Sequence, residues 1–197
     1  MENLIINPIG IVKNKANKEV LKYSNKDLTL DLNTAINQGS DLIKSKIIIN
    51  EEYRDCLEGI DDFSHIIIFF WTHKVPDNAR QIKKVHPAGI KKMPIKGIFA
   101  TRSPVRPNPI CKTTVKLIER KGDVLFVEGL DAIDNTPVID IKPHIPFYDS
   151  PINVKLANWM YKLMEELKNL TKNTSKNDSP NPYSVDIRNH PCLNPER

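Results

Sequence analysis

The sequence predicts a mainly β protein: a small antiparallel sheet or barrel followed by a C-terminal helix and tail. Short apolar segments rich in Ile, Val, Phe and Thr recur between residues 4 and 143, with turn residues between them. Only one long stretch, near the C-terminus, repeats its leucines at helical spacing. The seven glycines are scattered, so neither a G-x-G-x-x-G fingerprint nor a P-loop is present. This argues against a Rossmann-type nucleotide enzyme.

The strands are justified by local composition. In chain order they are predicted over residues 4–13, 28–32, 47–49, 63–71, 95–101, 113–119, 124–130 and 137–142. The first of these is one strand or two short ones around Pro8 and Gly10. The run 63–71 is apolar, β-branched and aromatic throughout, which is typical of a buried central strand. Lys121-Gly122-Asp123 predicts a hairpin turn.

Two helices are expected. Asn50 can cap a short helix over residues 51–57, which Gly59 would end. Asp149 or Ser150 can cap a longer helix with Pro151 at its first position. The sequence therefore predicts a barrel domain over 1–150, a packing helix over 151–170, and a linker and tail over 171–197. The tail either docks on the rest of the protein or stays disordered.

Composition limits the class of protein. With 197 residues the chain fits one domain plus an appendage, or two small domains. No apolar run approaches the ~18 residues that span a bilayer, and no secretory signal is recognisable. Three widely spaced cysteines fit a reduced, cytoplasmic protein, and the histidines and cysteines show no metal-ligand spacing. The net charge of +5 permits a polyanionic partner such as nucleic acid.

The loop over residues 101–110 is the most informative local feature. Prolines at 104, 107 and 109 fix the backbone and make this loop stiff. It carries Arg102 and Arg106, whose guanidinium groups suit an anion or a carboxylate. The alternative is a proline-rich connector with solvated arginines.

Two further groups of polar residues are candidates for ligand contact. Asp131 and Asp134 precede a turn at 135–137, where they bind ribose hydroxyls, offset a cation or only cap the turn. Asp140 lies in an apolar strand and is expected to pair with one of the arginines. His73 and Lys74 follow the apolar strand, either as ligand contacts or as its polar exit. His86, in the basic loop 75–94, is a candidate phosphate contact.

Five stretches follow one another in the order of a known family. They are Pro8-Ile9-Gly10, LEGIDDFSH at 57–65, FATRSPVRPNPI at 99–110, Leu130-Asp131, and TPVIDIKPHIPF at 136–147. Together they resemble the TsaA-like β-barrel family of S-adenosylmethionine-dependent tRNA methyltransferases, over about residues 4–150. Members of that family methylate N6 of threonylcarbamoyladenosine at position 37 of the tRNA anticodon loop.

The resemblance implies a non-Rossmann barrel that binds S-adenosylmethionine, acts on the tRNA anticodon loop and forms a homodimer. The residues implied for the cofactor are His73, Lys74, Arg102, Leu130, Asp131, Ala132, Ile133 and Asp134; those implied for the substrate are Arg106 and Asn108. Residues 20–27 do not match the family's segment after its first strand. Cys111 stands where many members have glycine, so it either crowds the pocket or packs as a small hydrophobe.

The chemistry expected from this resemblance centres on two side chains. The N6 atom of threonylcarbamoyladenosine is a poor nucleophile, so a base is useful, and Asp131 is the candidate; its rival role is cofactor binding. Arg106 is the candidate receptor for the substrate's threonine carboxylate. Two other functions remain open: a barrel that binds S-adenosylmethionine or a nucleotide without catalysis, and a methyltransferase of this family with another substrate.

Overall fold

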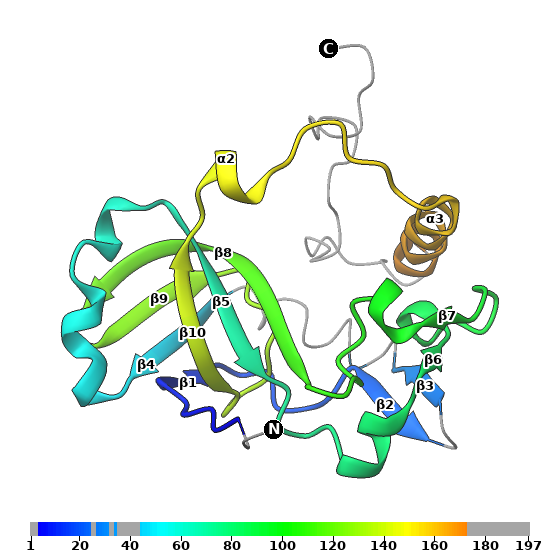
Figure 1. Cartoon of the computed structure of the whole chain (residues 1–197), viewed down its shortest axis with the longest axis horizontal. Coiled ribbons are helices and arrows are strands. Elements are labelled where there is room, and N and C mark those ends of the chain that lie inside the picture. The colour runs from blue at the N-terminus through cyan, green and yellow to red at the C-terminus, as the bar shows by residue number, and fades with distance from the viewer. Residues whose placement is uncertain (1–3, 25–26, 32–33, 35–43, 173–197) are drawn as a thin grey trace. The chain divides into compact units, whose positions relative to one another are not determined.

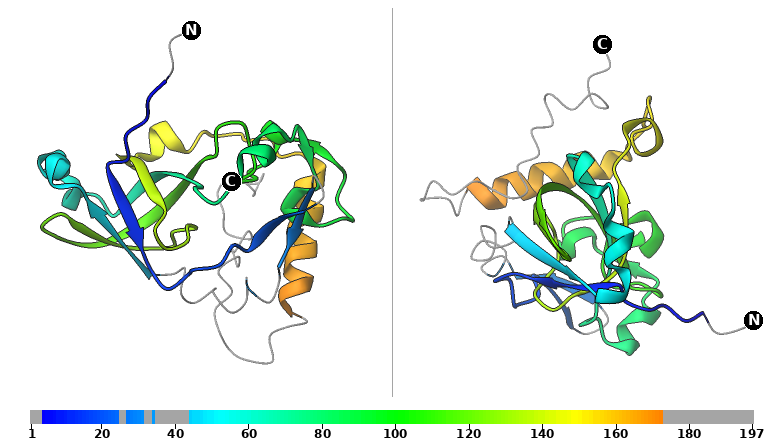
Figure 2. Two further views of the ribbon diagram at one scale, coloured as in Figure 1. Left: turned by 90° about the horizontal axis from the view of Figure 1, so that it is seen from below. Right: turned by 90° about the vertical axis from the view of Figure 1, so that its left-hand side faces the viewer.

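Six antiparallel strands close into a barrel, as the sequence predicts (Figure 1). The structure is a computed structural model that describes residues 4–24, 27–31, 34 and 44–172. Around the barrel the order is β1 (Gly10–Lys13), β10 (Pro137–Pro143), β5 (His65–Trp71), β8 (Ile110–Lys121), β9 (Val124–Glu128) and β4 (Lys44–Ile49). In Figure 2, β1 in dark blue lies beside β4 in cyan, and this pairing closes the barrel.

The barrel interior holds the main hydrophobic core. Alternate residues of β4 point inward, so Ser45, Ile47 and Ile49 are buried while their neighbours are more exposed. Strand β5 is buried along most of its length and pairs with β10 on one side and β8 on the other. This confirms the central strand expected at 63–71.

A glycine allows the closing strands to approach each other. A Cβ atom on Gly10 would meet the carbonyl oxygen of Ile48 and crowd Ile49 on the neighbouring strand β4. Because backbone atoms cannot move aside cheaply, only glycine fits this position.

A second, smaller core lies under the basic loop and the proline-rich loop. Its buried members are Ala79, Val85, Ile98 and Val105. Short elements supply them or pack beside them: β2 (Leu21–Ser24) paired with β3 (Asp27–Leu30), β6 (Lys84–Val85) paired with β7 (Lys96–Gly97), and the 3₁₀ helices η3 (Asp77–Gln81), η4 (Pro87–Gly89) and η5 (Ile98–Ala100). This core fixes the segments that carry the candidate site.

Three expectations for the first unit need correction. The strand expected over 4–13 is only β1, because residues 4–9 do not pair as a strand. The helix over Glu51–Leu57 is a 3₁₀ helix, η1, and a second 3₁₀ turn, η2 (Ile60–Asp62), follows it. Asn50 does not cap it, because its side-chain amide donates to the carbonyl of Pro8 at 3.0 Å. The strand expected over 95–101 is only β7, because the chain then turns into η5, where the Thr101 N–H donates to the carbonyl of Ile98.

The described chain divides into two compact units, the second of which begins at Ile145. It holds α2 (Pro146–Asp149) and α3 (Asn158–Lys172). The long helix therefore begins at Asn158 rather than at Pro151, and Asn153 between them has a left-handed φ of 59° that no α-helix contains. Residues 171–172 end α3, and the rest of the expected linker and tail lies outside the described residues. None of the helices described here has the length and hydropathy to cross a membrane.

Candidate functional site

The end of β5 is bound to the proline-rich loop. Trp71 pairs with Ile110 in the β5–β8 ladder. The next residue, Thr72, donates its N–H to the carbonyl of Pro109 at 2.8 Å and its hydroxyl to the same oxygen at 3.0 Å. His73, which comes next along the chain, is therefore held near the end of the 101–110 loop.

The loop itself is anchored at several points. Ser103 and Val105 are buried, and Val105 belongs to the second core. The Ser103 N–H donates to the Thr101 hydroxyl at 3.3 Å, and the Val105 N–H donates to the Ser103 hydroxyl at 3.3 Å. With three prolines between residues 104 and 109, these contacts support the rigid loop that the sequence predicts.

The two arginines of this loop have different partners. Arg102 is exposed and donates through Nη2 to the carbonyl of Lys112 on β8 at 2.9 Å. Arg106 is half-buried and donates through Nη1 to the carbonyls of Thr101 at 3.3 Å and Ser103 at 3.2 Å. Its guanidinium carbon lies 6.0 Å from the ring centroid of Phe99. Each guanidinium keeps donors that bond nothing in the described part of the chain.

The connection from β9 to β10 carries the acidic candidates. Asn14 holds it, because its side-chain amide donates to the carbonyl of Ala132 at 2.8 Å. The side chains of Leu130 and Ala132 are buried, whereas Asp131 between them is exposed. Asp131 is thus the side chain of 130–132 that is open to a ligand, and half-buried Ile133 follows it.

Asp134 is engaged in the turn. Its carboxylate accepts the N–H of Asn14 at 3.1 Å and the side-chain amide of Asn135 at 2.7 Å, and its own N–H donates to Ala16 at 2.6 Å. These contacts match the turn-capping alternative that the sequence left open for this residue.

Four side chains from three segments form an electrostatic cluster. Burial raises the pKa of the Cys111 thiol to about 11; the charge of Asp131 adds to this rise, while Arg106 and Arg102 oppose it. Cys111 lies on β8 opposite Phe70 of β5. The ladder thus places Cys111 beside the end of β5, where the charges of the loop arginines and of Asp131 act on its thiol.

Asp131 has an unusual environment. Its side chain reaches solvent, yet the protein around it desolvates the carboxylate enough to raise its pKa, which the charge of Arg102 only partly offsets. Among the described residues, no hydrogen bond and no ion pair reaches this carboxylate. The Asp131 carboxylate is therefore a hydrogen-bond acceptor to which no described group donates.

His73 also has unused hydrogen-bonding capacity. Burial lowers its pKa, Lys74 lowers it further, and Glu19 opposes both. Its Nδ1 is buried and has no partner in the described chain. A neutral imidazole with a free nitrogen can bond a ligand hydroxyl or amide. Lys74 is exposed, and its side chain forms no hydrogen bond or ion pair within the described residues.

The remaining candidates are placed as follows. Asn108 is exposed, and its carbonyl accepts the N–H of Ile110 at 2.7 Å. Asp140 pairs with Lys142 at 2.8 Å and has 47% of its side chain exposed. The expectation that an arginine pairs with it is therefore wrong, because it faces outward beside a lysine of the same strand. His86 bonds the carbonyl of Met93 through Nδ1 at 2.7 Å.

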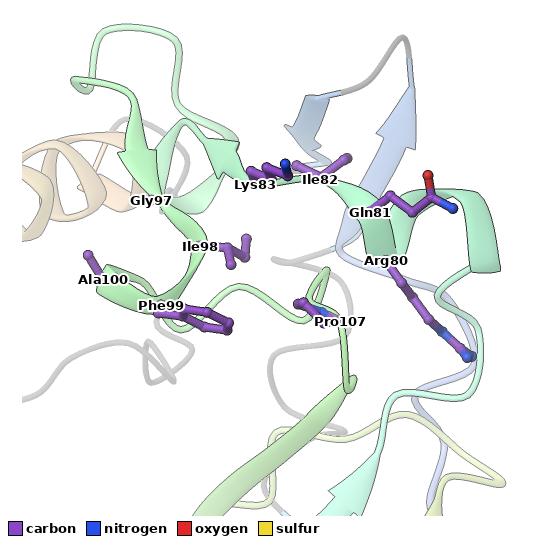
Figure 3. A pocket seen from close by; sticks show the side chains of 9 residues that line it. All are labelled: Arg80, Gln81, Ile82, Lys83, Gly97, Ile98, Phe99, Ala100 and Pro107. Atoms are coloured by element: carbon purple, nitrogen blue, oxygen red, sulfur yellow. The ribbon is translucent and has the colours of Figure 1, made fainter. Parts of the chain in front are cut away.

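An open hollow of about 770 Å³ adjoins the loop (Figure 3). It is lined by Arg80, Gln81, Ile82, Lys83, Gly97, Ile98, Phe99, Ala100 and Pro107. Sequence reasoning missed it, because residues 95–101 were expected to form a strand. The available signal was Phe99, an aromatic residue directly before a proline-rich loop.

No metal site is visible in the parts that the structure describes, where His, Cys, Asp and Glu side chains do not gather in groups of three. The donor set suits an organic ligand instead. It combines one carboxylate acceptor, a neutral imidazole and a guanidinium with spare donors.

Known proteins resemble the chain over this region. The family described as "tRNA-methyltransferase O N-terminal domain" matches residues 35–150, more than half of the chain. A "Probable S-adenosyl-L-methionine-binding protein" of Methanothermobacter thermautotrophicus is 44% identical over 54% of this chain and 74% of its own length. The human "tRNA (adenine(37)-N6)-methyltransferase" is 39% identical over 70% of this chain, but the match covers only 31% of that protein.

A solved structure has the same fold. The structure titled "Crystal structure of TrmO from Pseudomonas aeruginosa" superposes with a TM-score of 0.56 at 23% identity. The match covers 78% of this chain and 62% of that one, so this chain spans less than two thirds of it.

Proposed function

Because the chain belongs to the tRNA-methyltransferase O N-terminal domain family, we propose that it binds S-adenosylmethionine and methylates an adenosine of tRNA. The proposed target is N6 of threonylcarbamoyladenosine at position 37 of the anticodon loop. The names of the relatives support both halves: some are named for binding the cofactor and others for methylating adenine 37.

The observation that carries the proposal is the Asp131 carboxylate. It is desolvated, reaches solvent and lacks a donor among the described residues. Because the side chain is exposed, this acceptor is open to water, and an ammonium group or hydroxyls are what a ligand needs to replace that water. S-adenosylmethionine carries an α-ammonium group and two ribose hydroxyls, so it fits this requirement.

The other proposed cofactor contacts surround Asp131. Arg102, fixed by the carbonyl of Lys112, has donors left for the cofactor's carboxylate. His73 offers its unpartnered Nδ1, and the backbone of 130–134 offers amides and carbonyls. When bound, the cofactor supplies a methyl group already activated by its sulfonium.

The protein's own contribution is placement and proton handling. The rigid loop would hold the target base in line and limit the access of water. Asp131, whose raised pKa makes it a stronger base than an ordinary carboxylate, is the proposed acceptor of the N6 proton. The same carboxylate cannot fully serve as cofactor ligand and base, so these two roles are alternatives for Asp131.

Arg106 is the proposed receptor for the substrate's threonine carboxylate. Its Nη1 is occupied by two carbonyls of its own loop, which orient the guanidinium. Nε and Nη2 bond nothing that the structure describes, so a fork of donors is available to a carboxylate. Asn108, exposed two residues further on, is proposed to assist.

The test is to incubate the protein with S-adenosylmethionine labelled in its methyl group, together with tRNA that carries or lacks the threonylcarbamoyl group. Label in the modified tRNA alone is expected. The second candidate is a barrel that binds S-adenosylmethionine without catalysis, which the archaeal relative's name favours. Cofactor binding with no label in either RNA would support it, and absence of cofactor binding would refute both.

A further inference from the structure

The hollow beside the proline-rich loop is not used by the proposed cofactor site. Its apolar lining residues are Ile82, Ile98, Phe99 and Pro107, and Figure 3 shows the side chains of the last three near one another. The volume of about 770 Å³ lies within the range of ~300–1,000 Å³ that is usual for small-molecule sites. It is large enough for a nucleobase.

Phe99 lies at the rim of this hollow. It is 79% exposed, while its neighbour Ile98 is 4% exposed and packs in the second core. The backbone around it is fixed, because Ile98 donates to the carbonyl of Lys83 at 2.9 Å and Thr101 donates to Ile98 at 3.1 Å. Apart from its contact with Arg106, this ring buries little surface, and it provides a stacking surface on a rigid backbone.

The charge around the hollow indicates the kind of occupant. Residues 78–118 contain ten of the chain's 29 lysines and arginines and none of its 24 acidic residues, so the net charge of +5 originates here. Lys83 lines the hollow, and Lys84 follows it; both are exposed and without an ion pair in the described chain. Arg80 is already engaged, with Asp77 at 3.0 Å and the Trp71 ring at 5.2 Å. Free cations beside an exposed ring suit a polyanion with flat bases.

The hollow adjoins the proposed active site through one residue. The guanidinium of Arg106 lies over the Phe99 ring, and the same charge acts on the thiol of Cys111, which also responds to Asp131. Arg106 therefore contacts the ring at the hollow and also acts, through its charge, on a residue of the proposed cofactor site.

We propose that this hollow holds one unpaired base of the RNA substrate, adjacent to the methylated nucleotide. The base stacks on Phe99, and Lys83 meets its phosphate. The inference rests on the proposed function, since it assigns a part of the same RNA. A free small metabolite would not need the surrounding excess of cations.

The experiment uses an anticodon stem-loop RNA that carries threonylcarbamoyladenosine, with the full chain as wild type, Phe99→Ala and Phe99→Trp. RNA binding is measured by fluorescence anisotropy, and cofactor binding by calorimetry checks that each variant is folded. Truncation of Phe99 is expected to weaken RNA binding by about 10- to 100-fold, the effect of losing one stacked base, and tryptophan to restore it. Phe63→Ala, two residues before the start of β5 and 37% exposed, is the matched control that keeps full affinity.

A set of RNAs with single abasic sites in the loop identifies the base. One abasic site next to the target should weaken wild-type binding and have no added effect on Phe99→Ala, because both changes remove the same contact. The inference is overturned if Phe99→Ala binds the intact RNA as tightly as wild type, or if no abasic site loses its effect in that variant. Methyl transfer by the wild type is scored separately, so a protein that stacks the base but transfers no methyl group refutes the proposed function alone.

Discussion

Replacing Asp131 with asparagine removes the negative charge of a carboxylate that accepts no hydrogen bond from the described residues, and it keeps the shape of the side chain. If this carboxylate bonds the cofactor's ammonium group or hydroxyls, the variant loses a charge-assisted hydrogen bond. Such a bond contributes about 1.5–3 kcal/mol, since no group among the described residues competes for the carboxylate. Calorimetry should therefore show S-adenosylmethionine binding about 10- to 150-fold more weakly.

The same substitution should weaken cofactor binding but increase the stability of the fold. The pKa of Asp131 is raised in the folded state above its ordinary value of 3.8. The folded state binds the Asp131 proton more tightly than the unfolded state does. Its contribution to the free energy of unfolding is therefore fully present below pH 3.8 and is lost as the pH rises through the raised pKa. At pH 7 the variant, which is always neutral, should unfold at a higher urea concentration than the wild type.

The pH dependence of S-adenosylmethionine binding tests whether Asp131 contacts the cofactor. Wild-type affinity for S-adenosylmethionine should increase with pH from 4 upward until Asp131 is ionised, and the Asp131→Asn variant should lack this part of the increase. Asp140→Asn, which alters an exposed pair with Lys142, is the control that keeps wild-type behaviour. If Asp131→Asn binds the cofactor like wild type at every pH, Asp131 does not contact the cofactor.

Three further predictions follow from named contacts. Arg106→Ala should abolish the preference for threonylcarbamoyl-modified over unmodified tRNA while leaving cofactor affinity near wild type; an unchanged preference would exclude Arg106 as the carboxylate receptor. Gly10→Ala should lower the free energy of unfolding by more than ~2 kcal/mol, because the new Cβ meets the carbonyl of Ile48. A urea midpoint equal to that of the wild type would mean that β1 and β4 move apart at this position without cost. Cys111, with a thiol pKa of about 11, should be alkylated slowly by iodoacetamide at pH 7.5. Alkylation should be faster in Asp131→Asn, because the neighbouring negative charge is gone. Rapid alkylation of wild-type Cys111, mapped by mass spectrometry, would contradict the raised pKa of this thiol.

Local patterns in the sequence were sufficient for most of the barrel. The apolar run of β5 and the hairpin at Gly122 were predicted because each depends on neighbouring residues alone. The barrel and the family resemblance are confirmed. Strand β7 and the helix η1 were predicted differently, because their ends depend on partners far along the chain. Asn50, for example, bonds Pro8 instead of capping a helix.

The site was only partly accessible from the sequence. The motif named Asp131 and Arg102, but their proximity to Cys111 depends on the register of β5 with β8 and on Asn14 holding the β9–β10 connection. No local pattern contains such long-range contacts.

Other parts of the site required the second core. The hollow at Phe99 exists because this core makes the chain turn at Ile98. Asp140 was assigned to an arginine because the sequence does not tell which face of β10 it occupies.

The most direct measurement is nucleoside mass spectrometry of tRNA after reaction with the protein and S-adenosylmethionine. Threonylcarbamoyladenosine should be converted to its N6-methyl derivative, unmodified adenosine should be untouched, and Asp131→Asn should form little product. A methyl group on any other nucleoside, or full conversion by Asp131→Asn, would contradict it.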